Sequence, residues 1–226
     1  MYLDMSVFDG SPQYQTYVII GFVGTVLSSI ASMITILLIN KMKITGYIKL
    51  ILTMTWFQLV YDVSFFNGTV NVGNYWVSYV ANVWQLVGGI GSSLISNWIA
   101  FVVLYVVYNK RSIDIVGNYE YMLASAIVPG FAVAIVYSIG SIPEGHNQHL
   151  VDIANLGLYY YIRLVSIFLN FIMFGMASYY NHRIRSKGLG KSPAEQAINT
   201  LCRRLMYYPL LQVNTVLLLL CGGGSF

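Results

Sequence analysis

Long apolar stretches separated by short polar segments make up this chain. Six of them reach or approach the roughly 20 residues that a helix needs to cross a bilayer, at about 17–40, 50–66, 77–108, 121–142, 156–180 and 206–221. The pattern predicts an all-α fold, a polytopic transmembrane helical bundle. We expect residues 1–226 to form a single transmembrane domain, with 181–204 as its longest polar loop.

Composition supports the same fold class. The chain is 57% hydrophobic and 9% charged, whereas about a quarter of the residues of a typical soluble domain are charged. So few charges would not cover the surface of a soluble domain of this length. We therefore expect membrane lipids to surround the helices.

The basic residues are distributed unevenly between the two ends of the predicted spans. Of twelve Lys and Arg residues, all except Arg163 lie outside the spans, after the first, third and fifth of them. The loops after the second and fourth spans carry no basic residue, and the loop after the fourth contains Glu144 and Asp152. Basic loops stay in the cytoplasm, so we predict an external N-terminus, with the plasma membrane favoured and an organelle membrane open. The net charge of +4 then reflects topology, and no nucleic-acid partner is expected.

Two ionisable residues lie well inside predicted spans. Asp62 is near the outer end of the second span and Arg163 is at a similar depth in the fifth. Charges inside a membrane are costly and indicate function or pairing. In one interpretation both line an outward-facing ligand pocket, where Arg163 binds an anionic group. In the other they pair structurally or extend toward the interface.

Aromatic residues gather near the same predicted outer interface, where Trp and Tyr commonly form a belt. They are Tyr61, Trp76, Trp84, Tyr159, Tyr160 and Tyr161. Most fit the belt, while Trp84 and Tyr160 are candidate ligand contacts. The second span is followed by Asn67-Gly68-Thr69, an acceptor sequence for N-glycosylation when it lies in an external loop.

Small residues mark where helices can approach closely in lipid. Gly21, Gly24, Ser28 and Ser32 recur every three or four residues, and Gly88 to Ser93 predicts a helix-packing seam. Pro129 interrupts the fourth span, which neighbouring membrane helices tolerate.

The sequence shows none of the common catalytic motifs. We find no nucleophile–base arrangement, no HExxH and no phosphate-binding loop, and the three histidines lack metal-ligand spacing. Cys202 and Cys221 fall on the cytoplasmic side and in a late span, which disfavours a disulfide. We therefore expect no enzyme activity, no cofactor and no metal site.

Three segments carry a family likeness. They are Tyr47–Thr55 with Asp62–Gly68; Ser93, Asn97–Ala100 and Leu104-Tyr105; and Leu201–Leu210, which contains Arg203, Arg204, Tyr208 and Pro209. Together they resemble the cyclic-AMP-receptor-like branch of seven-helix G-protein-coupled receptors. The resemblance implies a receptor-like bundle of which six helices are visible, and we leave open whether the chain continues beyond Phe226 into a seventh.

The resemblance also implies signalling. A ligand would bind between the outer helix halves, and the cytoplasmic side would engage a heterotrimeric G protein. The candidate partner contacts are basic, although anionic lipid headgroups would attract the same side chains: Lys110, Arg111, Arg183, Arg185, Arg203 and Arg204.

An alternative function is a non-signalling accessory subunit of a larger membrane complex. No cysteine opens the third span, and that span ends with Tyr105-Val-Val-Tyr108 in place of the Asp/Glu-Arg-Tyr of the largest receptor class. Both departures favour the accessory subunit, whereas the Arg203–Pro209 segment and the loop charges favour the receptor.

Overall fold

The described part of the protein is almost entirely helical. The computed structural model describes residues 12–39, 46–70, 75–109, 113–141 and 147–186, and no strand occurs among them. The helices are α1 (Pro12–Ile39), α2 (Gly46–Val70), α3 (Tyr75–Asn109), α4 (Ile115–Gly140), α5 (Gln148–Asp152), the π-helix η3 (Ile153–Tyr159) and α6 (Tyr160–Ser186). The all-α prediction is confirmed for these residues.

Each of the first five predicted spans lies on helical structure, but the helices begin and end at other residues than the predicted spans do. The helix α2 continues to Val70, so Asn67 lies on it and not in the predicted loop beyond Phe66. The fifth predicted span, from 156, is preceded by a helical start at Gln148. Pro129 lies inside α4 without ending it. The sixth predicted span, 206–221, lies outside the described residues, so the seven-helix receptor fold stays a prediction.

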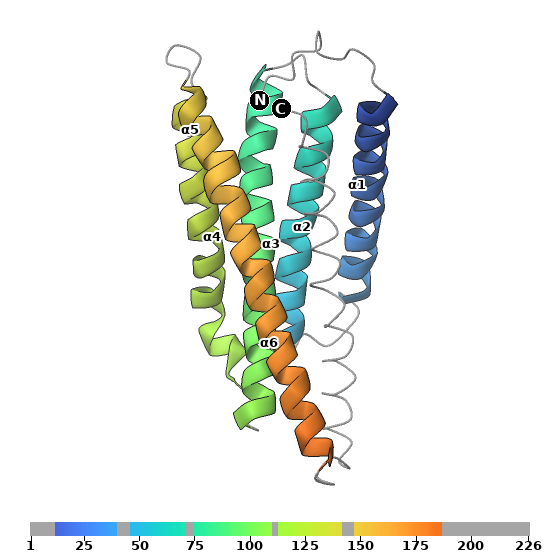
Figure 1. Ribbon diagram of the computed structural model, residues 1–226, viewed down its shortest axis with the longest axis vertical. Coiled ribbons are helices and arrows are strands. Elements are labelled where there is room, and N and C mark those ends of the chain that lie inside the picture. The colour runs from blue at the N-terminus through green and yellow to red at the C-terminus, as the bar shows by residue number, and fades with distance from the viewer. Residues whose placement is uncertain (1–11, 40–45, 71–74, 110–112, 142–146, 187–226) are drawn as a thin grey trace. The chain divides into compact units, whose positions relative to one another are not determined.

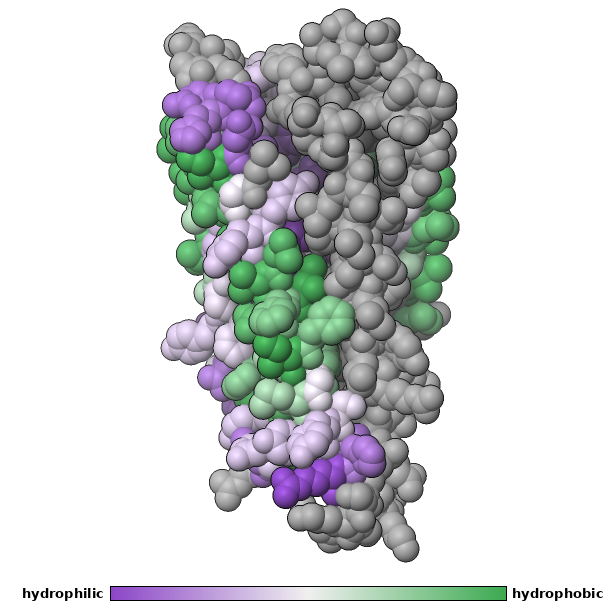
Figure 2. All heavy atoms as spheres, viewed as in Figure 1, coloured by the Kyte–Doolittle hydropathy of each residue, from purple (hydrophilic) through white to green (hydrophobic). Residues whose placement is uncertain are grey.

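Four helical segments of the described chain are long and apolar enough to cross a membrane: Phe22–Ile39, Tyr75–Asn109, Ile115–Gly140 and Gln148–Arg183. This indicates a membrane protein. On α6 the exposed surface is apolar along its middle and hydrophilic toward its C-terminal end (Figure 2). The helix α2 is not among the four, because polar residues including Gln58 and Asp62 lower its mean hydropathy.

One compact unit comprises residues 1–95 and 119–163. Its core joins side chains of α2, α3, α4, α5 and η3: Tyr61, Leu86, Ile90, Val133, Tyr137, Val151, Ala154 and Tyr159. In the same unit α1 packs beside α2 (Figure 1). At the edge of the core, Asn82 Nδ2 donates a hydrogen bond to Tyr137 Oη over 2.9 Å.

Glycines of α3 set how closely its neighbours approach. A Cβ on Gly88 would lie 2.7 Å from the backbone nitrogen of Tyr61 in α2, and one on Gly89 would lie 2.6 Å from the Tyr159 hydroxyl. On α4, a Cβ on Gly130 would lie 3.2 Å from Val87 Cα. The predicted packing seam is confirmed at Gly88 and Gly89, and through these glycines and Val87 the helix α3 contacts α2, η3 and α4.

The second compact unit comprises residues 96–118 and 164–226, of which the later part of α3 and most of α6 are described. Asn170 is fully buried and its Nδ2 donates a hydrogen bond to Ser96 Oγ over 3.1 Å. Farther along the same helices the rings of Tyr108 and Tyr180 meet edge to face, with centroids 5.1 Å apart. Polar and aromatic contacts therefore join α3 to α6 in this unit.

Candidate functional site

Arg163 occupies a site walled by tyrosines. It lies one turn into α6 and is only 5% exposed. Its Nη1 donates a hydrogen bond to Tyr159 Oη over 2.7 Å, and its Cζ lies 5.3 Å from the ring centroid of Tyr61 and 5.4 Å from that of Tyr159. Aromatic faces attract a guanidinium through their quadrupole. We call these three residues the Arg163 site.

The Arg163 site leaves one donor unused. The buried Nε of Arg163 has no hydrogen-bond partner within the described part of the chain. A buried polar group without a partner costs free energy, and a buried guanidinium more so. A hydrogen-bond acceptor placed at this nitrogen would satisfy the donor.

Asp62 occupies a separate site between α1 and α2. It is 2% exposed, its Oδ2 accepts a hydrogen bond from Ser28 Oγ over 2.6 Å, and its Oδ1 accepts one from Gln58 Nε2 over 3.0 Å. Gln58 precedes Asp62 by one helical turn, so the two side chains share a face of α2. We call these residues the Asp62 site.

The two charges thus have neutral partners instead of each other. In the sequence they formed a candidate ion pair, but the structure gives the carboxylate to Ser28 and Gln58 and the guanidinium to the tyrosines. The sites are still neighbours, since Tyr61, which contacts Arg163, directly precedes Asp62.

The sequence pattern places Tyr61 and Tyr159 in the aromatic belt, but in the structure both are buried, at 6% and 5% exposed. The four-residue spacing of Tyr159 and Arg163, which places both on one helix face, was the available signal. Tyr160, a predicted ligand contact, is half-buried and meets the Tyr159 ring at 5.4 Å, so it lies at the edge of the Arg163 site.

Trp84 does not lie with the two charges. Its indole is 46% exposed and contacts Phe131 of α4 edge to face, with centroids 6.3 Å apart. It therefore forms part of the outer surface of its unit, as Trp76 and Tyr161 do, both 67% exposed.

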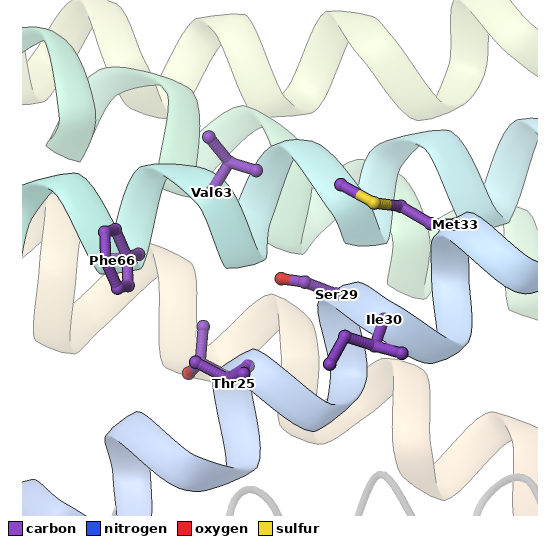
Figure 3. Close-up of a pocket in the computed structure, with 7 residues that line it drawn as sticks. Thr25, Ser29, Ile30, Met33, Val63 and Phe66 are labelled. Atoms are coloured by element: carbon purple, nitrogen blue, oxygen red, sulfur yellow. The ribbon is translucent and has the colours of Figure 1, made fainter.

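A shallow groove of about 200 Å³ lies between α1 and α2. Figure 3 shows Thr25, Ser29, Ile30 and Met33 on α1 facing Val63 and Phe66 on α2. Asp62 and Arg163 do not line this groove, which is therefore not the outward-facing pocket expected for them.

No family model, no curated protein and no solved structure matches the chain.

The predicted partner contacts are described only in part. Arg183 is exposed near the end of α6, and its side chain takes part in an interaction there. Arg185 lies on the same helix, and Lys110, Arg111, Arg203 and Arg204 lie outside the described residues. Among the residues that the structure describes, no group of three or more His, Cys, Asp or Glu side chains is placed to hold a metal ion.

Asn67 is expected to remain unglycosylated. Its Nδ2 donates a hydrogen bond to the backbone oxygen of Val63 over 3.0 Å, one turn back on α2, whereas modified acceptors lie in exposed loops. Treatment of the protein from a eukaryotic host with an N-glycosidase should leave its mass unchanged. An acceptor sequence inserted in 71–74 provides a control for exposure to the modifying enzyme, and a glycan on Asn67 would contradict the helical placement.

Proposed function

We propose that the chain is a receptor-like membrane protein that couples an event at its predicted outer side to a heterotrimeric G protein in the cytoplasm. The buried charge of Arg163 is the observation that carries the proposal. A buried guanidinium is costly to place in a bundle surrounded by lipid, and ionisable residues inside membranes generally mark functional sites. The tyrosine hydroxyl and rings hold this charge without neutralising it.

The position of α3 supports the same proposal. Three segments approach it through Gly88, Gly89 and Val87, so a shift of η3 at the Arg163 site would press directly on α3. The resemblance of the second, third and sixth spans to the cyclic-AMP-receptor-like family adds the direction of signalling. No ligand class follows from these residues.

The test is G-protein activation by the full chain in nanodiscs, measured as exchange of labelled GTP on a panel of purified heterotrimers. We expect at least one heterotrimer to exchange faster with the protein than with empty nanodiscs. Changing Arg203 and Arg204 together to Ala should lower that excess at least threefold, because the predicted cytoplasmic contact loses two charges. A Gln148→Ala/His149→Ala variant, changed at exposed positions of α5, is the control. No acceleration with any heterotrimer would refute the proposal.

A second function, an accessory subunit of a membrane complex, is favoured by α1. Only 11% of the apolar stretch of α1 is buried, and the groove between α1 and α2 is open at the surface of the protein. A partner helix would cover such a face. Isolation of the tagged chain from its native membrane in mild detergent should then yield a partner in fixed stoichiometry, whereas the receptor would be recovered without one.

A further inference from the structure

The groove between α1 and α2 lies beside the contacts that hold these two helices together. The rings of Phe22 and Phe66 meet with their centroids 5.3 Å apart. Farther along, Ser28 Oγ donates the 2.6 Å hydrogen bond to Asp62. The residues that follow the hydrogen-bonded pair, Ser29 on α1 and Val63 on α2, line the groove (Figure 3). The two helices are therefore in contact on one side and leave an open space on the other.

This open space is long and narrow. Its lining on α1 runs from Thr25 to Met33, which is about 12 Å along a helix axis. A volume of about 200 Å³ spread over that length corresponds to a cross-section of roughly 17 Å², whereas a helix about 10 Å wide has a cross-section of roughly 80 Å². A partner helix can therefore lay side chains over the groove but cannot enter it. A single hydrocarbon chain can lie along its whole length.

The walls of the groove suit an apolar occupant. Ile30 and Met33, which are 49% and 52% exposed, line it and continue into the exposed apolar surface of α1 around Leu27. That surface belongs to Phe22–Ile39, a stretch long and apolar enough to cross a membrane. Ser29 is directed toward α2 in Figure 3, but a serine hydroxyl in a helix can bond to the carbonyl one turn back. Water would need two to four polar partners, so a hydrocarbon chain fits the groove better.

We propose that the groove binds an acyl chain of a membrane phospholipid. The chain supplies dispersion contacts on the open side of the lining residues. Lipid tails are as apolar as leucine side chains, so the chain changes one apolar surrounding for another when it enters. Because only 11% of the apolar stretch of α1 is buried, a chain held between α1 and α2 adds to the contacts that keep α1 in place. This lipid site is independent of G-protein coupling.

The test is photolabelling of the full chain in nanodiscs of phosphatidylcholine that carries a diazirine in one acyl chain, with labelled residues identified by mass spectrometry. We expect Met33 and Val63, in the groove, to take up at least threefold more label than Leu37, which is 64% exposed on α1 and lies outside the groove. Ser29→Phe fills the groove from its wall and should lower the label on Met33 and Val63 at least threefold. Leu27→Phe adds the same ring at an exposed position outside the groove and is the matched control.

Equal labelling of Leu37 and the groove residues would show only the lipid that surrounds any membrane helix, and would overturn the site. Protection of the groove together with a dimer or a copurifying protein would mean that a protein covers it, which also overturns the proposal. A diazirine-bearing sterol that labels Met33 and displaces the phospholipid label would refute the acyl chain as occupant. If Ser29→Phe fails to fold, Val63→Phe fills the groove from α2 and carries the same expectation for Met33. Groove labelling without G-protein activation would refute the proposed function alone.

Discussion

Replacing Gly88 by Ala should severely reduce the amount of folded protein. A Cβ at this position would lie 2.7 Å from the backbone nitrogen of Tyr61 and 2.8 Å from the backbone oxygen of Phe57. Backbone atoms cannot rotate away, so α2 would have to separate from α3. We expect a loss of about 2 kcal/mol or more, at the upper range of overpacking, measured as a lower melting temperature and less monodisperse protein in detergent.

Two other glycines complete a graded series. The atoms nearest to a Cβ on Gly91 would belong to the Phe57 ring, at 2.6 Å and beyond, and a Cβ on Gly175 would meet nothing within 4 Å. Gly91→Ala should therefore be milder, because a side chain can shift. Gly175→Ala should be neutral or stabilising by up to about 1 kcal/mol, the difference in helix propensity. Equal effects at Gly88 and Gly175 would show that α2 and α3 do not approach through Gly88.

Arg163→Gln should destabilise the protein in a way that depends on Tyr159. The substitution removes the 2.7 Å hydrogen bond to Tyr159 Oη and both ring contacts. A hydrogen bond to a charged group contributes about 1.5–3 kcal/mol, so Arg163→Gln and Tyr159→Phe should be non-additive by a similar amount. The measurement is a double-mutant cycle on unfolding in detergent.

The comparison cycle combines Arg163→Gln with Asp62→Asn. Since Asp62 holds Ser28 and Gln58 in the structure, its coupling to Arg163 should be clearly smaller than that of Tyr159. A larger coupling for Asp62 than for Tyr159 would contradict the separate placement of the two charges.

The helices and the charged residues could be predicted from the sequence, but the partners of the charged side chains could not. Hydrophobic runs predict spans because each run has to match the bilayer thickness, and five of them lie on the described helices. Asp62 and Arg163 were found because charges are rare in such runs. Their partners were not, because the choice between Ser28, Tyr159 and a direct ion pair depends on how the helices rotate against one another.

The aromatic residues show the same limit. Tyr61 and Trp84 have similar sequence surroundings, yet Tyr61 is 6% exposed and Trp84 is 46% exposed. Belt and core positions differ by the direction in which the helix presents the side chain. The π-helix could not be predicted either, since one extra residue in an apolar run leaves its length and composition unchanged.

The burial of Asn170 bears on how the chain enters the membrane during synthesis. A helix carrying Arg163 and Asn170 would expose both polar groups to hydrocarbon if it were released into lipid alone, where unsatisfied groups are costly. Asn170 instead donates to Ser96 on α3, a helix made earlier by the ribosome. Docking on α3 satisfies the amide donor of Asn170, so we expect insertion of the last described helix to be coupled to assembly of the bundle.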